Sequence, residues 1–356
     1  FAELCMDEYS RLLPAENRFP SAAGGKGFAP LAEYVHSLGL KFGIHIMRGI
    51  PRQAVHRNTK IKGSARTARE IAKRNSICQW NTDMYGVDAA KDGAREYYAS
   101  LFELYASWGV DFIKCDDICR ELPQEEAELM LLSDCLKHCG RDMVLSLSPG
   151  PALLEKAELY KQAANMWRIT DDFWDDWALL YAMFERAEKW CTHAGPGHWP
   201  DADMLPIGPI RQIEGQSNRT KFTHDEQRTM LTLWSIFRSP LIIGDMTGFD
   251  AFTMELVTNQ RVLAMHRSSR HAHQVWHRHI GGTEFILWTS VCADGGQYAA
   301  VFNAGDDSGT VSVPLIDLEA ENAAQAESLW TGEVFPLRGS LEVPLPAHGA
   351  AAFRLV

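Results

Sequence analysis

The segment GVDFIKCDDIC, residues 109–119, decides how the sequence is interpreted, because an apolar run of strand length ends in charged residues. Buried parallel strands are apolar along their length, and burying an unpaired charge costs several kcal/mol. Lys114, Asp116 and Asp117 therefore need a reason to stand where they do. A strand end that opens into an active site provides one.

Similar apolar runs alternate with helical patterns from residue 30 to about residue 245. The runs are LKFGIHIM, VDFIKCD, DMVLSLS, ANMWRIT, HWPDADML and SPLIIGDM. Amphipathic segments such as AREYYASLFELYASWG (94–109), which ends on Gly109, lie between them. This series of strand–helix units predicts an α/β fold, a (β/α)8 TIM barrel over residues 1–267, with its first two strands expected upstream of Phe1.

A different pattern begins near residue 268, where short alternating segments are separated by Gly, Asp and Asn turns and no crossover helices intervene. The segments are EFILWTSV, QYAAVFNA, GTVSVPL, AESLWT, SLEVPL and AAAFRLV. They predict a C-terminal antiparallel β-sandwich over residues 268–356.

Composition limits the classes of partner. The 356 residues carry a formal charge of −11, which argues against nucleic acid and against an anionic membrane surface. No apolar run is long enough for a membrane span, and the first residues lack a signal-peptide pattern, so a cytoplasmic protein is expected. The eight cysteines show no zinc-type pairs, and Cys135 and Cys139 fit helix packing. No metal or cofactor is expected, and the chain is expected to be a monomer or a homodimer.

Polar residues follow the apolar runs, at the strand ends where a barrel collects its catalytic groups. They are His45 and Arg48, Lys114, Asp116 and Asp117, Ser146 and Ser148, Arg168, Asp171 and Asp172, Asp201 and Asp203, and Asp245. Two facing carboxylates with cations nearby suit hydrolysis of a glycoside. Asp116 and Asp172 are placed for this role, and Lys114 lies on the same face of its strand as Asp116. Lys114 and Arg168 could each hold a sugar hydroxyl.

Other polar and aromatic residues have structural interpretations. We expect Asp117 to cap the following helix, and Asp175 and Asp176 to be acids at a helix start. Asp201 and Asp203 could contact substrate or hold loop backbone, and the sequence leaves both roles open. Packing is the expected role for most of the four tryptophans Trp167, Trp174, Trp177 and Trp199.

Four motifs follow one another along the chain: GVDFIKCDD, WRITDDFWDDW, AGPGHWPDADMLPIG and LTLWSIFRSPLIIGDM. In this order they resemble glycoside hydrolase family 27, which contains α-galactosidases and α-N-acetylgalactosaminidases. The resemblance implies a barrel followed by an antiparallel domain, and a reaction that retains anomeric configuration through a covalent intermediate. It also implies Asp116 as the nucleophile and Asp172 as the acid/base, and it places Ser148 near the sugar's 2-position. The strand-end argument adds Lys114, Arg168, His45 and Asp203 as residues around the substrate.

The sequence departs from the family pattern at three places. The tryptophan motif and the acidic pair that hold the sugar's 4- and 6-hydroxyls have no counterpart in it. Ile118 stands where the family often has a cysteine, which puts the usual disulfide in doubt. Ser148 stands where α-galactosidases tend to have a glutamate that reads the 2-position. A small residue there enlarges the pocket. Galactose and N-acetylgalactosamine therefore both remain open as the sugar.

Two other functions compete with a glycosidase. A metal-dependent barrel hydrolase would use Asp116, Asp117, Asp203 and Asp245 as oxygen ligands and would lose activity with a chelator. A carbohydrate-binding protein on an inactive barrel would bind a sugar without turnover.

Overall fold

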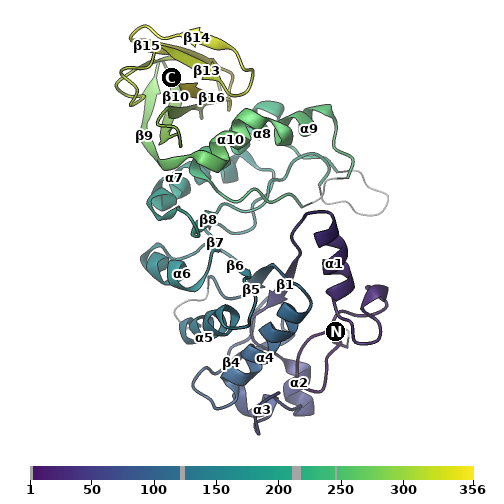
Figure 1. Cartoon of the computed structure of the whole chain (residues 1–356). Helices are drawn as coiled ribbons and strands as arrows, with labels where there is room; N and C mark the ends of the chain where they lie inside the picture. The colour runs from purple at the N-terminus through teal and green to yellow at the C-terminus, as the bar shows by residue number, and fades with distance from the viewer. Residues whose placement is uncertain (1–2, 121–124, 211–217, 245–246) are drawn as a thin grey trace. The chain divides into compact units, whose positions relative to one another are not determined.

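The computed structural model describes residues 3–120, 125–210, 218–244 and 247–356 (Figure 1). The chain divides into two compact units, Phe1–Arg168 and Ile169–Val356. Each unit has helices and strands of its own. Among the described residues, no helix combines the length and the apolar character that crossing a membrane would need.

A parallel sheet forms the centre of the first unit. Its strands lie in the order β1 (Gly43–Met47), β5 (Phe112–Asp116), β6 (Val144–Leu147) and β7 (Met166–Arg168). The elements around them are η1 (Pro20–Ala22), α1 (Ala29–Ser37), α4 (Ala94–Ser107), α5 (Glu126–Lys137), η2 (Leu154–Lys156) and α6 (Ala157–Ala163). Each strand lies inside one of the predicted apolar runs, and the parallel sheet with its helices is consistent with a TIM barrel.

Helix α4 shows how the sequence pattern produces this arrangement. Its buried face repeats at three- and four-residue spacing through Tyr98, Leu101, Phe102 and Tyr105. The helix ends at Ser107, and Gly109 follows with a φ of +79°, a left-handed conformation that suits a helix terminus. The chain then turns directly into β5.

The carboxylate of Asp111 fastens the start of β5 to its neighbours. Oδ2 accepts a 2.8 Å hydrogen bond from the amide of Phe42, which precedes β1, and lies 2.7 Å from His36 Nε2. Oδ1 accepts a 2.6 Å bond from Arg141, which precedes β6. Burial raises the pKa of Asp111, but these bonds outweigh it and lower that pKa to about 2. One charged group thus ties the beginnings of three strands together.

The segment between β1 and α4 forms a small antiparallel sheet that the sequence patterns did not predict. The sheet has the order β2 (Ile50–Pro51), β4 (Met84–Val87) and β3 (Ala72–Lys73), and it is accompanied by α2 (Arg52–Arg57) and α3 (Ala68–Ile71). Strands of two residues are too short to show an alternating pattern. We call this segment between β1 and α4 the excursion. It follows the carboxyl end of β1, which is the side of the sheet where barrels place their active sites.

The second unit begins with a short strand and several helices. They are α7 (Trp177–Trp190), η3 (Cys191–His193), β8 (Trp199–Asp201), α8 (His224–Phe237), α9 (Ala251–Thr258) and α10 (Gln260–Ser268). The prediction of a strand at SPLIIGDM is wrong for the residues that the structure describes, because Ile242 makes only an isolated parallel bridge with Met204. Pro240 has no amide hydrogen to donate, and Gly244 offers no side chain to pack. Asp245 lies outside the described residues.

The predicted antiparallel domain forms the C-terminal part of the second unit. Its larger sheet has the order β14 (Val334–Pro336), β13 (Gln325–Ser328), β16 (Ala350–Leu355), β11 (Gln297–Asn303), β10 (Thr283–Val291) and β9 (Arg270–Ile280). A second sheet pairs β12 (Gly309–Pro314) with β15 (Ser340–Leu345). Phe285, Leu287, Val301, Val343 and Phe353 belong to the core of this domain. The sequence patterns missed β9, which is rich in histidine and arginine, and the short β14.

The opposite face of the larger sheet is also buried. Trp288 of β10 packs against Phe237 of α8 with ring centroids 6.4 Å apart, and Phe302 of β11 packs against Phe184 of α7 at 5.0 Å. His348 adds a polar contact, because its Nδ1 lies 2.8 Å from a carboxylate oxygen of Glu226 in α8. The C-terminal sheet therefore shares a continuous core with α7 and α8.

We predict that Asp111→Asn lowers the free energy of unfolding by about 1–2 kcal/mol at pH 7. The folded-state pKa of Asp111 lies below its ordinary value, so the contribution is complete above about pH 4 and is lost as the pH falls toward 2. Urea unfolding of both proteins at pH 7, 4 and 3 measures this. Asp142→Asn, at an exposed aspartate near β6, is the matched control. An equal loss at pH 7 and pH 3 would contradict the electrostatic explanation.

Candidate active site

Polar side chains from neighbouring strands meet at the carboxyl end of the parallel sheet in the first unit. His45 of β1 is the register partner of Lys114 in β5, and Lys114 is the partner of Ser146 in β6. Side chains two residues apart on a strand share a face, so Asp116 lies on the same side as Lys114. Ser148 follows β6 by one residue. The structure thus brings His45, Lys114, Asp116 and Ser148 together, as the strand-end argument predicts.

The carboxylate of Asp116 is held by three hydrogen-bond donors. Ser148 Oγ donates to Oδ1 at 2.8 Å, and the amide of Asp117 donates to the same oxygen at 3.1 Å. His45 Nε2 lies 3.0 Å from Oδ2, where an ionised carboxylate can only accept. The side chain of Asp116 is 12% exposed, so it is largely shielded from solvent.

The same donors keep Asp116 charged. Burial alone raises the pKa of a carboxyl, but the bonds from His45, Ser148 and the Asp117 amide outweigh it and hold the pKa of Asp116 below its ordinary value. The result is an oriented, ionised carboxylate at the end of a strand.

Two cationic side chains accompany it in the first unit. Lys114 is half-buried, and in the described part of the chain it makes no hydrogen bond or ion pair, so its ammonium group is available to a ligand. Arg168 ends β7 and is buried, and its carbonyl accepts a 2.8 Å bond from the amide of Ala152 in the loop after β6.

A buried ion cluster lies behind Asp116, and sequence reasoning missed it. Arg48 Nη2 lies 2.9 Å from Asp117 Oδ2, and Arg48 Nη1 lies 3.2 Å from Glu128 of α5. Glu125 is 3.7 Å from the same guanidinium. Tyr98 of α4 donates to Glu128 at 2.5 Å. The prediction that Asp117 caps the next helix is wrong, because α5 begins after Glu125 and the Asp117 carboxylate pairs with Arg48.

The charged groups of this cluster shift one another's pKa values. Burial raises the pKa of Glu128 to about 7, although Arg48 opposes that shift. Burial lowers the pKa of Arg48, and its carboxylate neighbours more than reverse this, so it stays charged. The sequence pointed to Arg48 as a cation at a strand end, but it did not reveal the partners of Arg48. These partners are about 70 or more positions away, and no spacing rule connects them to it.

The predicted acid/base residue lies in the second unit. Asp172 is exposed on the loop after β7, and its amide donates to Asp171 Oδ1 at 2.9 Å. Asp203 Oδ2 accepts a 2.8 Å bond from the amide of Phe173, the residue after Asp172. Asp203 thereby supports the backbone of the segment that carries Asp172. Its own amide is held by Asp201 Oδ1 at 2.8 Å.

Asp176 and Trp167 have the structural roles that the sequence predicts. Asp176 caps α7 by accepting a 2.8 Å bond from the amide of Ala178, which confirms a helix-start role, whereas Asp175 accepts from the amide of Lys221. Trp167 is fully buried and stacks on Tyr160, which confirms packing for that tryptophan.

The cysteines of the chain form no disulfide, and its potential metal ligands are dispersed among the described residues. All eight cysteines are described, and each is a free thiol, including the buried Cys115 and Cys119 on either side of the Asp116 segment. Within the described ranges, no group of three or more His, Cys, Asp or Glu side chains is arranged to hold a metal ion. Of the four proposed oxygen ligands, Asp245 lies outside those ranges.

The chain matches known proteins along nearly its whole length. Residues 62–268 match the family model described as alpha galactosidase A, and residues 282–355 match the alpha galactosidase C-terminal beta sandwich domain. Alpha-galactosidase 3 of Arabidopsis thaliana is 28% identical over 367 residues, which cover 98% of this chain and 69% of that protein.

Solved structures give stronger similarity. A GH27 β-L-arabinopyranosidase from Geobacillus stearothermophilus is 53% identical with a TM-score of 0.95, covering 100% of this chain and 82% of that one. An α-N-acetylgalactosaminidase-like protein from Bacillus halodurans is 47% identical with a TM-score of 0.88, covering 100% and 84%. The two family models, these neighbours and the strand-end carboxylates agree: the chain belongs to the α-galactosidase family of glycoside hydrolases, family 27.

Proposed function

We propose that the protein is a retaining exo-glycosidase that removes a terminal sugar of galactose-like configuration, with β-L-arabinopyranoside as its preferred substrate. The observation that carries the reaction type is the geometry of Asp116, an ionised carboxylate oriented by three donors at a strand end. The choice of sugar is supported by the 53% identity to the β-L-arabinopyranosidase.

The three candidate sugars share one stereochemistry and differ at two positions. A β-L-arabinopyranoside has the ring configuration of an α-D-galactopyranoside but lacks the hydroxymethyl group at C5. The N-acetylgalactosaminide differs from galactose at C2. Ser148 is the residue expected to face C2, and its hydroxyl already donates to Asp116. A small side chain there leaves room at C2 and accommodates a hydroxyl without demanding an acetamide.

The proposed reaction has two steps. Asp116 attacks the anomeric carbon and forms a glycosyl ester, while the carboxylic acid of Asp172 protonates the departing glycosidic oxygen. Asp172, now a carboxylate, then takes a proton from water as that water attacks the anomeric carbon and releases Asp116. Lys114 and Arg168 hold sugar hydroxyls, and Asp203 keeps the Asp172 segment in place through the Phe173 amide.

We predict that Asp116→Asn lowers kcat/KM of the full-length protein for p-nitrophenyl glycosides by at least about 10⁴-fold, because the amide is not a nucleophile. Asp172→Asn should cost about 10²–10⁴-fold on a methyl glycoside, and less on the p-nitrophenyl glycoside, whose leaving group needs little protonation. Asp171→Asn, which keeps an oxygen for the Asp172 amide, is the control and should retain most activity. Full activity of Asp116→Asn would refute the mechanism, and sugar binding without turnover by the unmodified protein would favour the binding-only alternative.

Substrate preference can be measured with three p-nitrophenyl glycosides, the β-L-arabinopyranoside, the α-D-galactopyranoside and the α-N-acetylgalactosaminide. We predict that kcat/KM is highest for the arabinoside and about 10–200-fold lower for the galactoside, the range expected when a site must exclude one small group. A higher value for the N-acetylated sugar would overturn the assignment and give Ser148 the role of admitting an acetamide.

The hydrogen bond from Ser148 should appear in the pH dependence. Ser148→Ala removes one of the donors that lower the pKa of Asp116, so the acidic limb of kcat/KM should move to higher pH. Ser146→Ala, the same change two residues earlier on β6, is the matched control and should leave the limb in place. An unchanged limb in Ser148→Ala would mean that the bond does not tune the nucleophile.

A further inference from the structure

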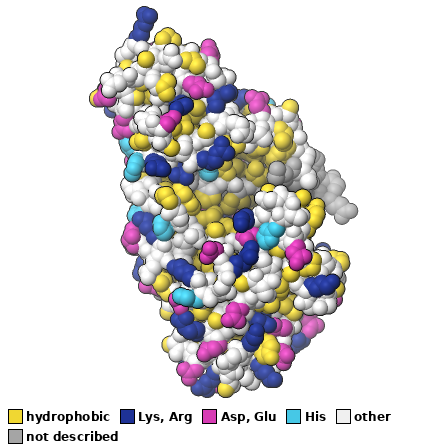
Figure 2. Space-filling model, viewed as in Figure 1, with side chains coloured by type: hydrophobic (Ala, Val, Ile, Leu, Met, Phe, Trp, Pro, Cys, Tyr) yellow, Lys and Arg dark blue, Asp and Glu magenta, His cyan; other side chains and the backbone are white. Residues whose placement is uncertain are grey.

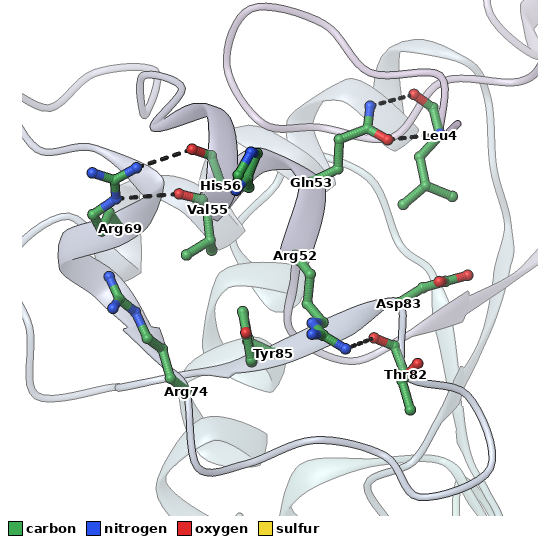
Figure 3. A pocket seen from close by; sticks show the side chains of 10 residues that line it. All are labelled: Leu4, Arg52, Gln53, Val55, His56, Arg69, Arg74, Thr82, Asp83 and Tyr85. Atoms are coloured by element: carbon green, nitrogen blue, oxygen red, sulfur yellow. Dashed lines mark hydrogen bonds between the residues drawn. The ribbon is translucent and has the colours of Figure 1, made fainter. Parts of the chain in front are cut away.

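The excursion between β1 and α4 contains a cavity of about 830 Å³ that the proposed reaction does not use. This volume lies within the range of small-molecule sites in proteins. Three arginines line it, Arg52 from α2, Arg69 from α3 and Arg74 just after β3. Figure 3 shows Arg74 extending toward the helix that carries Arg69, with Arg52 beside Tyr85 and Thr82.

Backbone carbonyls orient two of these arginines without neutralising them. Arg69 Nη2 donates to the carbonyl of His56 at 2.9 Å and Nε donates to that of Val55 at 3.4 Å. Arg52 Nη1 donates to the carbonyl of Thr82 at 2.9 Å. These contacts hold the guanidinium planes in place while leaving further N–H donors on each.

The positive charge in the cavity is only partly compensated. In the described ranges, none of Arg52, Arg69 and Arg74 forms an ion pair with a carboxylate, and Asp83 is the single acidic residue in the lining. Two other arginines of the same excursion behave differently, because Arg57 pairs with Glu3 and Arg66 pairs with Glu70.

This grouping stands out in an acidic chain of net charge −11. On the face seen in Figure 2, basic and acidic side chains are mixed across the surface. Three guanidinium groups around one cavity concentrate positive charge where a ligand can enter. Their planar donor groups match the oxygens of a carboxylate or a phosphate.

We propose that this pocket binds an anionic sugar, with Arg52, Arg69 and Arg74 holding its carboxylate or phosphate group. The cavity is much larger than one oxyanion and so has room for the sugar ring. The excursion leaves the carboxyl end of β1, so the ligand would be an acidic residue of the glycan on the active-site side. The identification of the ligand as a sugar rests on the proposed function, whereas the charge of the pocket does not.

Calorimetric titration of the full-length protein tests the ligand class. The probes are sodium glucuronate, glucose 6-phosphate, glucose and inorganic phosphate, all at one ionic strength. We expect at least one anionic sugar to bind with a Kd about tenfold or more below that of glucose, and the two anionic probes tell a carboxylate from a phosphate. Equal affinity for glucose and both anionic sugars would overturn the proposal. Inorganic phosphate binding as tightly as glucose 6-phosphate would overturn the sugar part and leave a simple oxyanion site.

A single substitution tests the location. Arg74 has no hydrogen-bond or ion-pair partner among the described residues, so Arg74→Gln removes a charge without breaking an internal contact. It should weaken binding of the preferred anionic sugar about tenfold. Arg18→Gln, at another exposed arginine, should not change it. Equal binding by Arg74→Gln and the unmodified protein would refute the site.

The same variant separates this inference from the glycosidase proposal. Turnover of the neutral p-nitrophenyl β-L-arabinopyranoside should be unchanged by Arg74→Gln, because that substrate carries no acidic residue. Loss of anion binding with full turnover supports the pocket as a separate site. Absence of turnover in the unmodified protein with anion binding intact would refute the proposed function alone.

Discussion

The conformation of the carboxyl end of β5 depends on the guanidinium of Arg48. The amide of Arg48 donates to the carbonyl of Asp116 at 3.0 Å, while its side chain binds both the carbonyl and the carboxylate of Asp117. Asp117 has a φ of +62°, in the left-handed region that is uncommon for residues other than glycine and is most accessible to Asn and Asp. The amide of Asp117 donates to Asp116 Oδ1. Arg48 can be buried because the carboxyl groups of Glu128 and Glu125 lie beside its guanidinium and compensate its positive charge.

This arrangement divides two tasks between adjacent aspartates. The carboxylate of Asp117 is held in an ion pair with Arg48. The carboxylate of Asp116 receives hydrogen bonds from donors only, which lower its pKa and keep it ionised. A site made of two equivalent carboxylates would instead raise one pKa by mutual repulsion. The nearby Lys114 and the hydroxyl of Ser148 add positive or donating groups around the same face.

The sequence predicts the parts of this fold in which a local pattern carries the information. Apolar runs ending in polar residues located β1, β5, β6 and β7, and alternation located β10, β11 and β15. The excursion after β1 was missed because its strands are two to four residues long, and β9 was missed because its exposed positions carry histidine and arginine. The role of Asp117 could not be predicted, since its partner Arg48 is 69 residues away and Asp117 equally fits a helix cap. An ion pair between residues far apart in the chain leaves no recognisable pattern among neighbouring residues.

Strands β10 and β11 are buried on both faces, so the C-terminal domain cannot be separated from the helices without exposing apolar surface. Trp288 and Phe302 contact α8 and α7 on one face of the sheet, while Phe285 and Val301 fill the sandwich on the other. Truncating the chain near residue 269 would remove the sheet that buries Phe237 of α8 and Phe184 of α7. Both helices would then expose large aromatic side chains to water. The C-terminal domain of this chain is therefore no detachable module: a sheet put in its place would have to present equivalent aromatic residues to α7 and α8.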